Sequence, residues 1–434
     1  MPGSLRRILG VGFGLAVIIG STLGIGILRT PGLVAGQLST SRTILTVWVV
    51  GGLYTLIGSV CFTELGAMLP QAGGYYVYAR RAFGDTVGFA VGWTDWLTYC
   101  AVLGYVSIGM AEFLAKLVPS LSGITQPVAV ALLVLFVGLQ WMGVRVSSRF
   151  QEWTTALKTV AFLVLVVACL ASSAGLSAGA SASTFPAAGP TLVGIIVALQ
   201  SVVITYGGWQ SALYFTEEDR DPGRNLPRSM IGGVVLVIGI YLLVNLALLS
   251  VLPVQALATS TLPAADAAQA IVGGRGAQVI TLLSLISLPP LLNAIMMIGT
   301  RILFAMGRDG LIWSPTGTVN AGGTPGVATL VTTAVAMALI MTGTFQRLVA
   351  TASFFLAANY AVCCVALIVL RRREPGLARP FRAWGYPWSA GLVLAGALLF
   401  LLGVLVGDSV NSAIALVLLA IGLAGRAVFA RRVR

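Results

Sequence analysis

The stretch Ile19-Gly20-Ser21-Thr22-Leu23-Gly24-Ile25-Gly26-Ile27-Leu28 decides the fold, because it places helix-weakening glycines in the middle of an apolar run. A second apolar run carries Ile204-Thr205-Tyr206-Gly207-Gly208-Trp209-Gln210 in a corresponding place. In a bilayer, each backbone N–H or C=O group without a hydrogen bond costs several kcal/mol, so a lipid-facing helix gains nothing from such a break. Two matching breaks therefore indicate freed backbone groups that bind something, as at the central site of a transporter.

The composition indicates an integral membrane protein. Of the 434 residues, 58% are apolar and 9% are charged, and the mean hydropathy is +0.97. Soluble domains carry about 25% charged residues. A net charge of +13 would suggest nucleic acid in a soluble protein, but here the basic residues lie in short loops. The membrane therefore accounts for the charge, and no nucleic-acid partner is expected.

The residue types also argue against catalysis and metal binding. The chain has no histidine, which removes the commonest general base and the commonest metal ligand. Its five cysteines lie in apolar runs and form no C-x-x-C pair, so we expect small buried side chains rather than disulfides. We expect no catalytic residues, no metal and no cofactor.

Runs of about 20 apolar residues predict twelve transmembrane helices. Their approximate ranges are 8–28, 43–69, 86–118, 125–144, 151–174, 190–217, 228–252, 275–306, 324–343, 345–370, 388–406 and 410–428. With a cytoplasmic N-terminus, all but five of the 26 Lys and Arg residues fall on the inner side. The outer five are Arg29, Arg42, Lys116, Arg275 and Arg347. This asymmetry predicts a multi-pass protein of the cytoplasmic (inner) membrane, with both termini cytoplasmic.

The positions of the two breaks predict an internal repeat. They head predicted helices one and six, so five helices from each make the blocks 1–174 and 190–370. An odd number of spans inverts the second block relative to the first, and two peripheral helices follow in 388–434. We expect an all-α membrane fold with a five-plus-five inverted-repeat core and discontinuous helices one and six. The Ala/Ser/Thr-rich segments 175–189 and 253–274 are expected to be extracellular connections without a domain of their own.

The first break offers two poles of opposite sign. Backbone N–H groups from about Gly24 to Ile27 start a half-helix and suit a carboxylate, whereas the carbonyls that end the preceding half-helix suit an ammonium. Two such poles about one α-carbon apart describe an α-amino acid. The residues expected to bind it are Ser21, Thr22, Gly24, Ile25, Gly26, Ile204, Thr205 and Gly207. The alternative is that the glycines only allow close helix packing.

These residues carry a resemblance to a known group of transporters. Gly20-x-x-Leu23-Gly24-Ile25-Gly26-Ile27-Leu28-Arg29-Thr30-Pro31 resembles the first-helix motif G-x-x-I-G-S-G-I-F-x-[ST]-P of the amino acid–polyamine–organocation superfamily. The second break is similar to the sixth-helix motif F-A-Y-G-G-W-N of its L-type branch. Similar stretches recur at 64–78, 217–228 and 300–310. The chain departs at Ile25, where serine is common, and at Ile204, where an aromatic gate is usual.

The resemblance, closest to L-type and bacterial amino acid permeases, implies a LeuT-like fold and sodium-independent transport by alternating access. Lys158 lies about eight residues, or roughly 12 Å, into its predicted helix. The resemblance implies that Lys158 reaches toward the first helix and replaces a coupling cation there, so that its deprotonation would couple transport to protons. Exchangers in the family carry a lysine at this position too. The structural alternative is a lysine that snorkels to the cytoplasmic surface.

Five further residues are candidates for the gate or pathway. Asp95 is costly inside a membrane helix and either lines the pathway or pairs with a neighbour. The others are Tyr99, Tyr206, Trp209 and Gln210. Aromatic residues on membrane helices more often serve packing or interfacial anchoring.

Two acidic groups are expected at the inner face. Glu64 is expected to join a network with Arg80 or Arg301. The acidic cluster 217–221, interleaved with arginines, is expected to form a helix-end and gate network rather than a metal site.

The sequence leaves substrate and coupling open. Neither break holds a carboxylate, which favours a neutral amino acid; a cationic amino acid or polyamine, with Asp95 as counter-charge, is the main alternative. An exchanger, an amino acid sensor and a membrane enzyme are further alternatives, the last disfavoured by the residue types above. The expected partners are the substrate, protons and the bilayer. The loop 119–124 has no cysteine, so no disulfide-linked partner subunit is expected.

Overall fold

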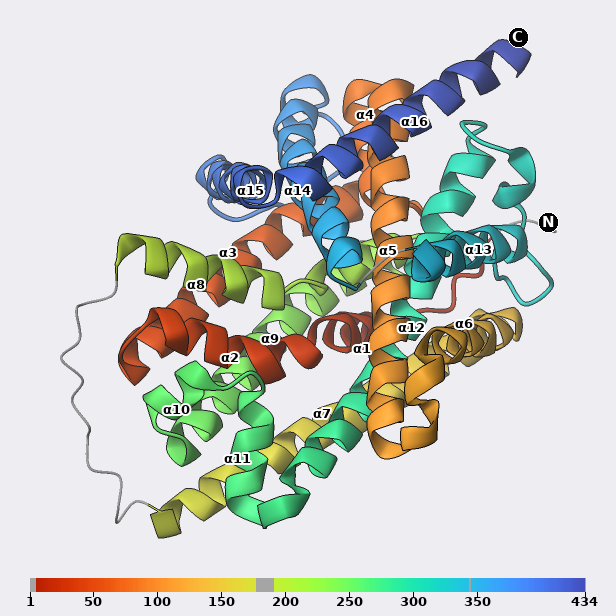
Figure 1. Cartoon of the computed structure of the whole chain (residues 1–434). Coiled ribbons are helices and arrows are strands. Elements are labelled where there is room, and N and C mark those ends of the chain that lie inside the picture. The colour runs from red at the N-terminus through yellow and green to blue at the C-terminus, as the bar shows by residue number, and fades with distance from the viewer. Residues whose placement is uncertain (1–4, 177–190, 343–344, 434) are drawn as a thin grey trace.

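The computed structural model describes residues 5–176, 191–342 and 345–433, and this part of the chain is built from α-helices without a β-strand (Figure 1). The helices are α1 Val11–Thr22, α2 Ile25–Gln37, α3 Ser41–Met68, α4 Tyr75–Phe83, α5 Asp85–Leu117, α6 Thr125–Trp141, α7 Val144–Leu176, α8 Leu192–Thr205, α9 Pro222–Val251, α10 Val254–Thr259, α11 Pro263–Val272, α12 Gly276–Arg308, α13 Gly326–Thr342, α14 Phe345–Arg373, α15 Trp388–Gly407 and α16 Ser409–Val433.

Ten helical stretches in the described residues are long and apolar enough to cross a membrane. The bent pair of α1 and α2 would make an eleventh, and α13 is apolar but only 17 residues long. The expected all-helical, multi-pass membrane protein is confirmed at this level. Twelve spans in an inverted repeat stay a prediction.

The structure differs from the expected boundaries around both breaks. The second half of the first span continues past Pro31 to Gln37, and α8 ends at Thr205, where residues up to 217 were expected to be helical. A 3₁₀ helix, η2 (Trp209–Phe215), follows α8 instead. Both differences arise because glycines interrupt the helical hydrogen bonds and the chain then re-forms helices on each side.

The segment 253–274 connects α9 to α12 and contains regular structure. It folds into the short helices α10 and α11, which pack against α2 and α12 respectively. Pro263 at the first helical position and the alanine-rich run after it favour α11. The other expected connection, 175–189, lies outside the described residues apart from its first two positions.

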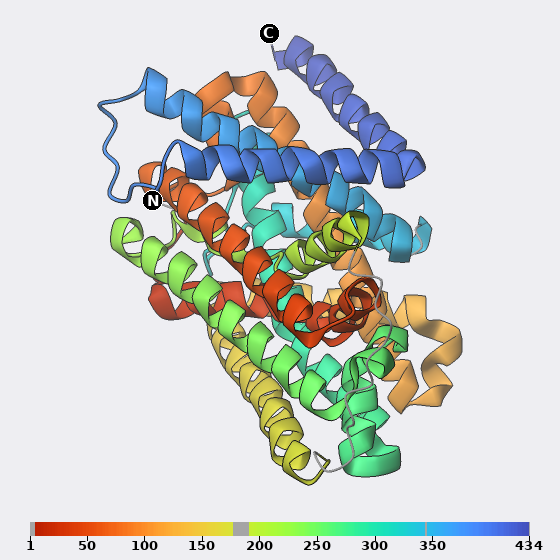
Figure 2. The same ribbon diagram turned by 90° about the vertical axis from the view of Figure 1, so that its left-hand side faces the viewer.

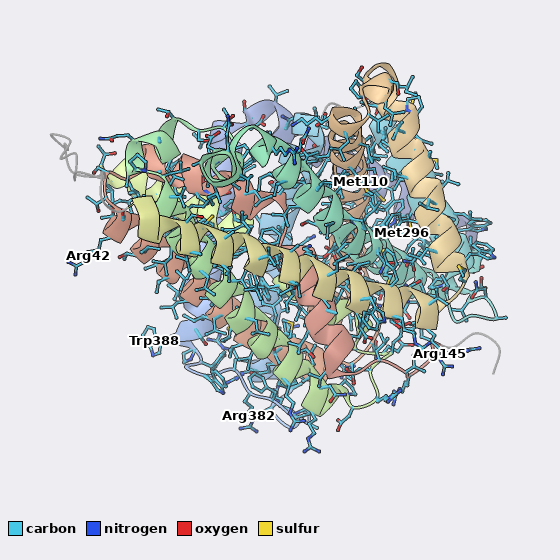
Figure 3. The ribbon with its side chains drawn as sticks, turned by 90° about the horizontal axis from the view of Figure 1, so that it is seen from below. Arg42, Met110, Arg145, Met296, Arg382 and Trp388 are labelled. Carbon is cyan, nitrogen blue, oxygen red and sulfur yellow. The ribbon has the colours of Figure 1, made fainter. Side chains whose placement is uncertain are left out.

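The arrangement places α1 and the two breaks inside the bundle. The long helix α5 packs against α12 and α14, and α1 packs against α7, α9 and α12. Figure 2 shows α15 and α16 running along one edge of the molecule, where they contact α14, α3 and α5. In Figure 3, Arg145 and Arg382 project from the lower edge of the molecule and Met110 lies toward the opposite edge.

Candidate functional site

The first break forms a sharp bend between two half-helices. The helix α1 ends at Thr22, α2 begins at Ile25, and the two are bent by 47°. Gly24 precedes α2 in an extended conformation, and no side chain caps the first N–H groups of α2. A side chain added at Gly24 would meet no atom within 4 Å. The positive end of α2 therefore has no side-chain cap, and there is open space beside Gly24.

The end of α1 leaves one position open. Helices end with carbonyl groups that lack intrahelical partners. The Gly20 carbonyl accepts a hydrogen bond from Lys158 Nζ at 2.8 Å, and the Thr22 carbonyl accepts one from Tyr241 Oη at 2.6 Å. The Ser21 carbonyl takes part in neither bond, and the Ser21 and Thr22 hydroxyls are buried without a hydrogen-bond partner in the described structure. The groups at this end of α1 that remain to bind a cation are therefore those of Ser21 and the Thr22 hydroxyl.

The second break lies directly against the first. Gly208 has a φ of +114°, and a Cβ atom there would lie 2.7 Å from both the carbonyl carbon and the carbonyl oxygen of Ser21. Both the left-handed backbone and the close approach require glycine. The two glycine-rich stretches, about 185 residues apart in the sequence, therefore meet backbone to backbone.

Tyr241 and Thr205 hold the two breaks together. The Tyr241 hydroxyl on α9 lies 2.6 Å from the Thr22 carbonyl oxygen and 3.0 Å from that of Thr205, so the two carbonyls share its one hydrogen. The Thr205 hydroxyl is 2.7 Å from the Thr30 hydroxyl of α2, and its methyl group packs against Gly26. Sequence analysis missed Tyr241. Its signal was a single phenol in the middle of the apolar helix Pro222–Val251.

The second break satisfies most of its own polar groups. The Gly207 N–H donates to the Ile204 carbonyl at 2.9 Å, and the Gly208 carbonyl accepts from the Ser211 hydroxyl at 2.7 Å. The Ile204 side chain is 55% exposed. The Ile204 carbonyl accepts the Gly207 N–H, and the Thr205 carbonyl accepts the Tyr241 hydroxyl. Neither carbonyl is therefore free to bind a substrate.

The gate candidates from the second break lie on two sides of it. The Gln210 side chain accepts hydrogen bonds from the Gly208 N–H and from the Tyr360 hydroxyl, both at 3.1 Å. The Trp209 ring is 5.6 Å from that of Tyr360. Tyr206 turns the other way, and its hydroxyl donates to the Trp48 carbonyl at 3.2 Å. Gln210 and Trp209 stay near the break, whereas Tyr206 belongs to an aromatic packing cluster.

Asp95 is buried and has a neutral partner. Its Oδ2 atom accepts a hydrogen bond from the Tyr214 hydroxyl of η2 at 2.9 Å, and Oδ1 has no partner in the described structure. The ring of Tyr99 is 5.4 Å from that of Tyr214. Asp95 forms no ion pair within the described residues. This arrangement ties α5 to η2 through a hydrogen bond rather than a salt bridge.

Lys158 is fully buried and points between two helices. Its ammonium donates to the carbonyls of Gly20 on α1 at 2.8 Å and Ser287 on α12 at 3.0 Å. No acidic side chain in the described structure pairs with it. The negative end of the α1 dipole lies beside the ammonium and offsets part of its burial cost. The side chain reaches toward the first helix and does not reach the surface.

The inner-face ion pairs differ from those expected for Glu64. Its carboxylate pairs with Arg371 and Arg379 and accepts the Ala383 N–H, so the expected pairing with Arg80 or Arg301 is wrong. Arg371 follows an apolar helix that sequence analysis could not place beside α3. In the cluster after η2, Glu218 forms a buried two-fold hydrogen-bonded pair with Arg301 at 3.0 Å.

A second ion-pair group lies where α4 and α12 end. Glu217 accepts hydrogen bonds from Arg308 and from the Ala72 N–H. Asp309 accepts from Arg80 and Tyr76, and burial together with this carboxylate raises the pKa of the Tyr76 phenol. No group of three or more potential metal-binding side chains occurs in the described residues.

Comparisons with known proteins show the family of the chain. The sequence profile of a family described as "Amino acid permease" matches residues 14–424. The serine/threonine exchanger SteT of Bacillus subtilis (strain 168) is 26% identical over 432 residues, which cover 98% of this chain and 96% of SteT. The b(0,+)-type amino acid transporter 1 of Oryctolagus cuniculus is 28% identical, covering 87% of this chain and 79% of its own. The large neutral amino acids transporter small subunit 2 of Mus musculus is 26% identical, covering 87% and 73%.

Proposed function

This chain belongs to the amino acid permease family, and we propose that it moves an α-amino acid across the cytoplasmic membrane by alternating access. The observation that carries the substrate class is the geometry of the first break. The uncapped N–H groups of α2 would receive the carboxylate, and Ser21 with the Thr22 hydroxyl would receive the ammonium. Gly208 and Tyr241 hold these two poles in place and do not bind substrate themselves.

A neutral side chain of small or medium size is the proposed preference. The open groups of the break include no carboxylate, and Asp95 is engaged by Tyr214. One relative is named a serine/threonine exchanger and another a large neutral amino acids transporter, which supports a neutral substrate. A cationic amino acid or polyamine remains the alternative, because Asp95 Oδ1 has no partner in the described structure.

The proposed transport is independent of sodium and coupled to protons. The Lys158 ammonium already binds the carbonyls of Gly20 and Ser287, where a coupling cation would otherwise bind. Loss of its proton would remove the charge that holds α1 to α12. Deprotonation would therefore weaken the contact between these two helices. Exchange without proton movement is the alternative, and the name of the Bacillus subtilis relative supports it.

The proposed architecture is twelve spans in a five-plus-five inverted repeat, with blocks 1–174 and 190–370 followed by 388–434. The matching positions of the α1–α2 and α8–η2 breaks support it. The charge asymmetry supports cytoplasmic termini. We propose no disulfide-linked partner, although one relative is named a small subunit, because all five cysteines are buried.

Uptake into proteoliposomes tests this function. The panel is radiolabelled L-alanine, L-serine, L-leucine, L-arginine and putrescine, each with and without an inward proton gradient and with sodium replaced by potassium. We expect gradient-stimulated uptake of a neutral amino acid that does not need sodium. Preferred uptake of L-arginine or putrescine would contradict the neutral preference. Counterflow that ignores the gradient would make the protein an exchanger, and binding without any flux would make it a sensor.

A further inference from the structure

A row of buried polar side chains leads away from Lys158 along one face of α7. Thr155, Gln151 and Ser147 precede Lys158 by three, seven and eleven residues, so they lie on the same side of the helix, spanning about 16 Å. All three are almost fully buried. Buried polar groups inside a membrane protein are costly and need hydrogen-bond partners or a function.

The partners of the Thr155 and Gln151 side chains come from α1 and α12, whereas the Ser147 hydroxyl bonds the carbonyls of Leu139 and Gly143. Thr155 Oγ1 and Gln151 Nε2 donate to the Ala16 carbonyl of α1 at 3.0 and 3.3 Å. The Asn293 amide of α12 donates to Gln151 Oε1 at 2.8 Å and to the Ser147 carbonyl at 3.2 Å. With Lys158, these residues bridge α7 to α1 and to α12.

The row continues to the end of α7 that the proposed orientation places in the cytoplasm. Gln140, at the end of α6, donates to Asn293 Oδ1 at 2.7 Å. Its carbonyl accepts from the Thr324 hydroxyl at 2.8 Å, in a loop where Ala321 is exposed. We call Thr155, Gln151, Ser147, Asn293 and Gln140 the polar seam. It runs from Thr155, one helical turn before Lys158, to Gln140, whose partner Thr324 lies three residues from the exposed Ala321.

The same face of α7 is apolar on the other side of Lys158. Its buried residues there are Phe162, Leu165, Val166 and Cys169, which belong to a hydrophobic cluster. Polar contact from Lys158 therefore extends along α7 in one direction only.

None of the charged or titratable side chains near Lys158 hydrogen-bonds it in the described structure. The helices α1 and α6 carry no charged side chain. The other charged or titratable side chains on α7 and on the helices packed against it are Arg145, Arg149, Glu152, Cys169, Arg224, Arg228, Tyr241, Asp266, Arg301 and Arg308. None of them hydrogen-bonds Lys158, whose two partners are backbone carbonyls.

We propose that the polar seam is the route by which Lys158 exchanges its proton with the cytoplasm. In the described conformation α1 covers the polar seam and excludes water from it. The contact is so close that a Cβ at Gly20 would lie 2.3 Å from Gln151 Nε2. Movement of the inner half of α1 away from α7 would separate the Ala16 and Gly20 carbonyls from their three donors together. Water would then reach the seam, one N–H bond of the ammonium would break, and the proton would pass to water on the inner side, leaving a neutral amine.

This inference rests on the proposed proton-coupled transport. The test compares two readouts in proteoliposomes loaded with pyranine, using the best substrate of the panel above. One readout is internal acidification driven by substrate, and the other is counterflow exchange of labelled substrate. The variants are Thr155→Val and Asn293→Leu, each of which removes hydrogen-bonding groups at nearly constant volume. The matched control is Thr154→Val, because that hydroxyl bonds only carbonyls of its own helix.

We expect both seam variants to slow acidification by about fivefold or more, the effect of one lost hydrogen bond, while exchange stays within about twofold and the control is unchanged. A parallel fall in both readouts would show a purely structural role and overturn the inference, as would acidification at the wild-type rate. Wild-type exchange without acidification would overturn proton coupling and the seam together, but not amino acid transport. Absence of wild-type transport would overturn the proposed function itself.

Discussion

The two breaks occupy corresponding places in the sequence but are completed in different ways. The first leaves the N–H groups of α2 uncapped and the Ser21 and Thr22 hydroxyls without partners in the described structure. The second bonds its own groups, through Gly207 to Ile204, Gly208 to Gln210 and Ser211 to Gly208. A matching pair of motifs therefore need not make a matching pair of binding sites. We interpret the first break as the binding element and the second as the support that fixes it.

The largest effect is expected from adding a methyl group at a glycine of the supporting break. Gly208→Ala forces an L-residue into a left-handed backbone, at about 1–2 kcal/mol, and puts Cβ against the Ser21 carbonyl. We expect a lower melting temperature and transport reduced about a hundredfold or more.

Gly24→Ala is the counterpart at the binding break, where the backbone is extended and the space is open. It should leave the melting temperature unchanged and weaken substrate binding alone; equal thermal destabilisation by both would refute the distinction.

The next effect is expected where the two breaks are joined. Tyr241→Phe removes the single O–H donor that the Thr22 and Thr205 carbonyls share, at about 1–3 kcal/mol. Because the substitution keeps the ring, packing against Trp48 should persist. We expect both thermal stability and substrate affinity to fall, as measured by thermal unfolding in detergent with and without substrate. Unchanged affinity would mean that the junction does not position the binding groups.

Ser21 in the first break and Ser211 just after the second give smaller effects, which separate substrate binding from stability. Ser21→Ala removes a hydroxyl with no protein partner in the described structure, so we expect KM to rise about tenfold with stability unchanged. Ser211→Ala removes a hydroxyl that bonds the Gly208 carbonyl, so stability should fall and KM should change less. The reverse pattern would assign substrate binding to the second break.

The smallest effect is expected at Ile204. Its side chain is 55% exposed, and its carbonyl already accepts the Gly207 N–H. Ile204→Ala should change transport kinetics by less than about twofold, as surface substitutions usually do. A large rise in KM would restore Ile204 to the gating role that its place in the motif suggests.

The sequence predicted the membrane class and the family well because both follow from local patterns. Apolar runs and glycine breaks are read along the chain, and the resemblance to the amino acid–polyamine–organocation superfamily is confirmed. The partners that complete the site depend on packing between distant segments. Tyr241 is one phenol in an apolar helix, and no local pattern places Arg371 of α14 beside Glu64 of α3. The α7 residues of the polar seam recur every three or four positions in the sequence, but no local pattern brings Asn293 of α12 to them.

The central claim is that the first break recognises the ammonium and carboxylate of an α-amino acid together. Competition against uptake of the preferred labelled amino acid tests it directly, using that amino acid, its analogue without the carboxylate and its analogue without the amine. We expect the intact amino acid to compete and each truncated analogue to lose about a hundredfold or more in affinity, because each leaves one pole unpaired. Equal competition by the amine lacking a carboxylate would contradict the account and point to a polyamine or simple cation as the substrate.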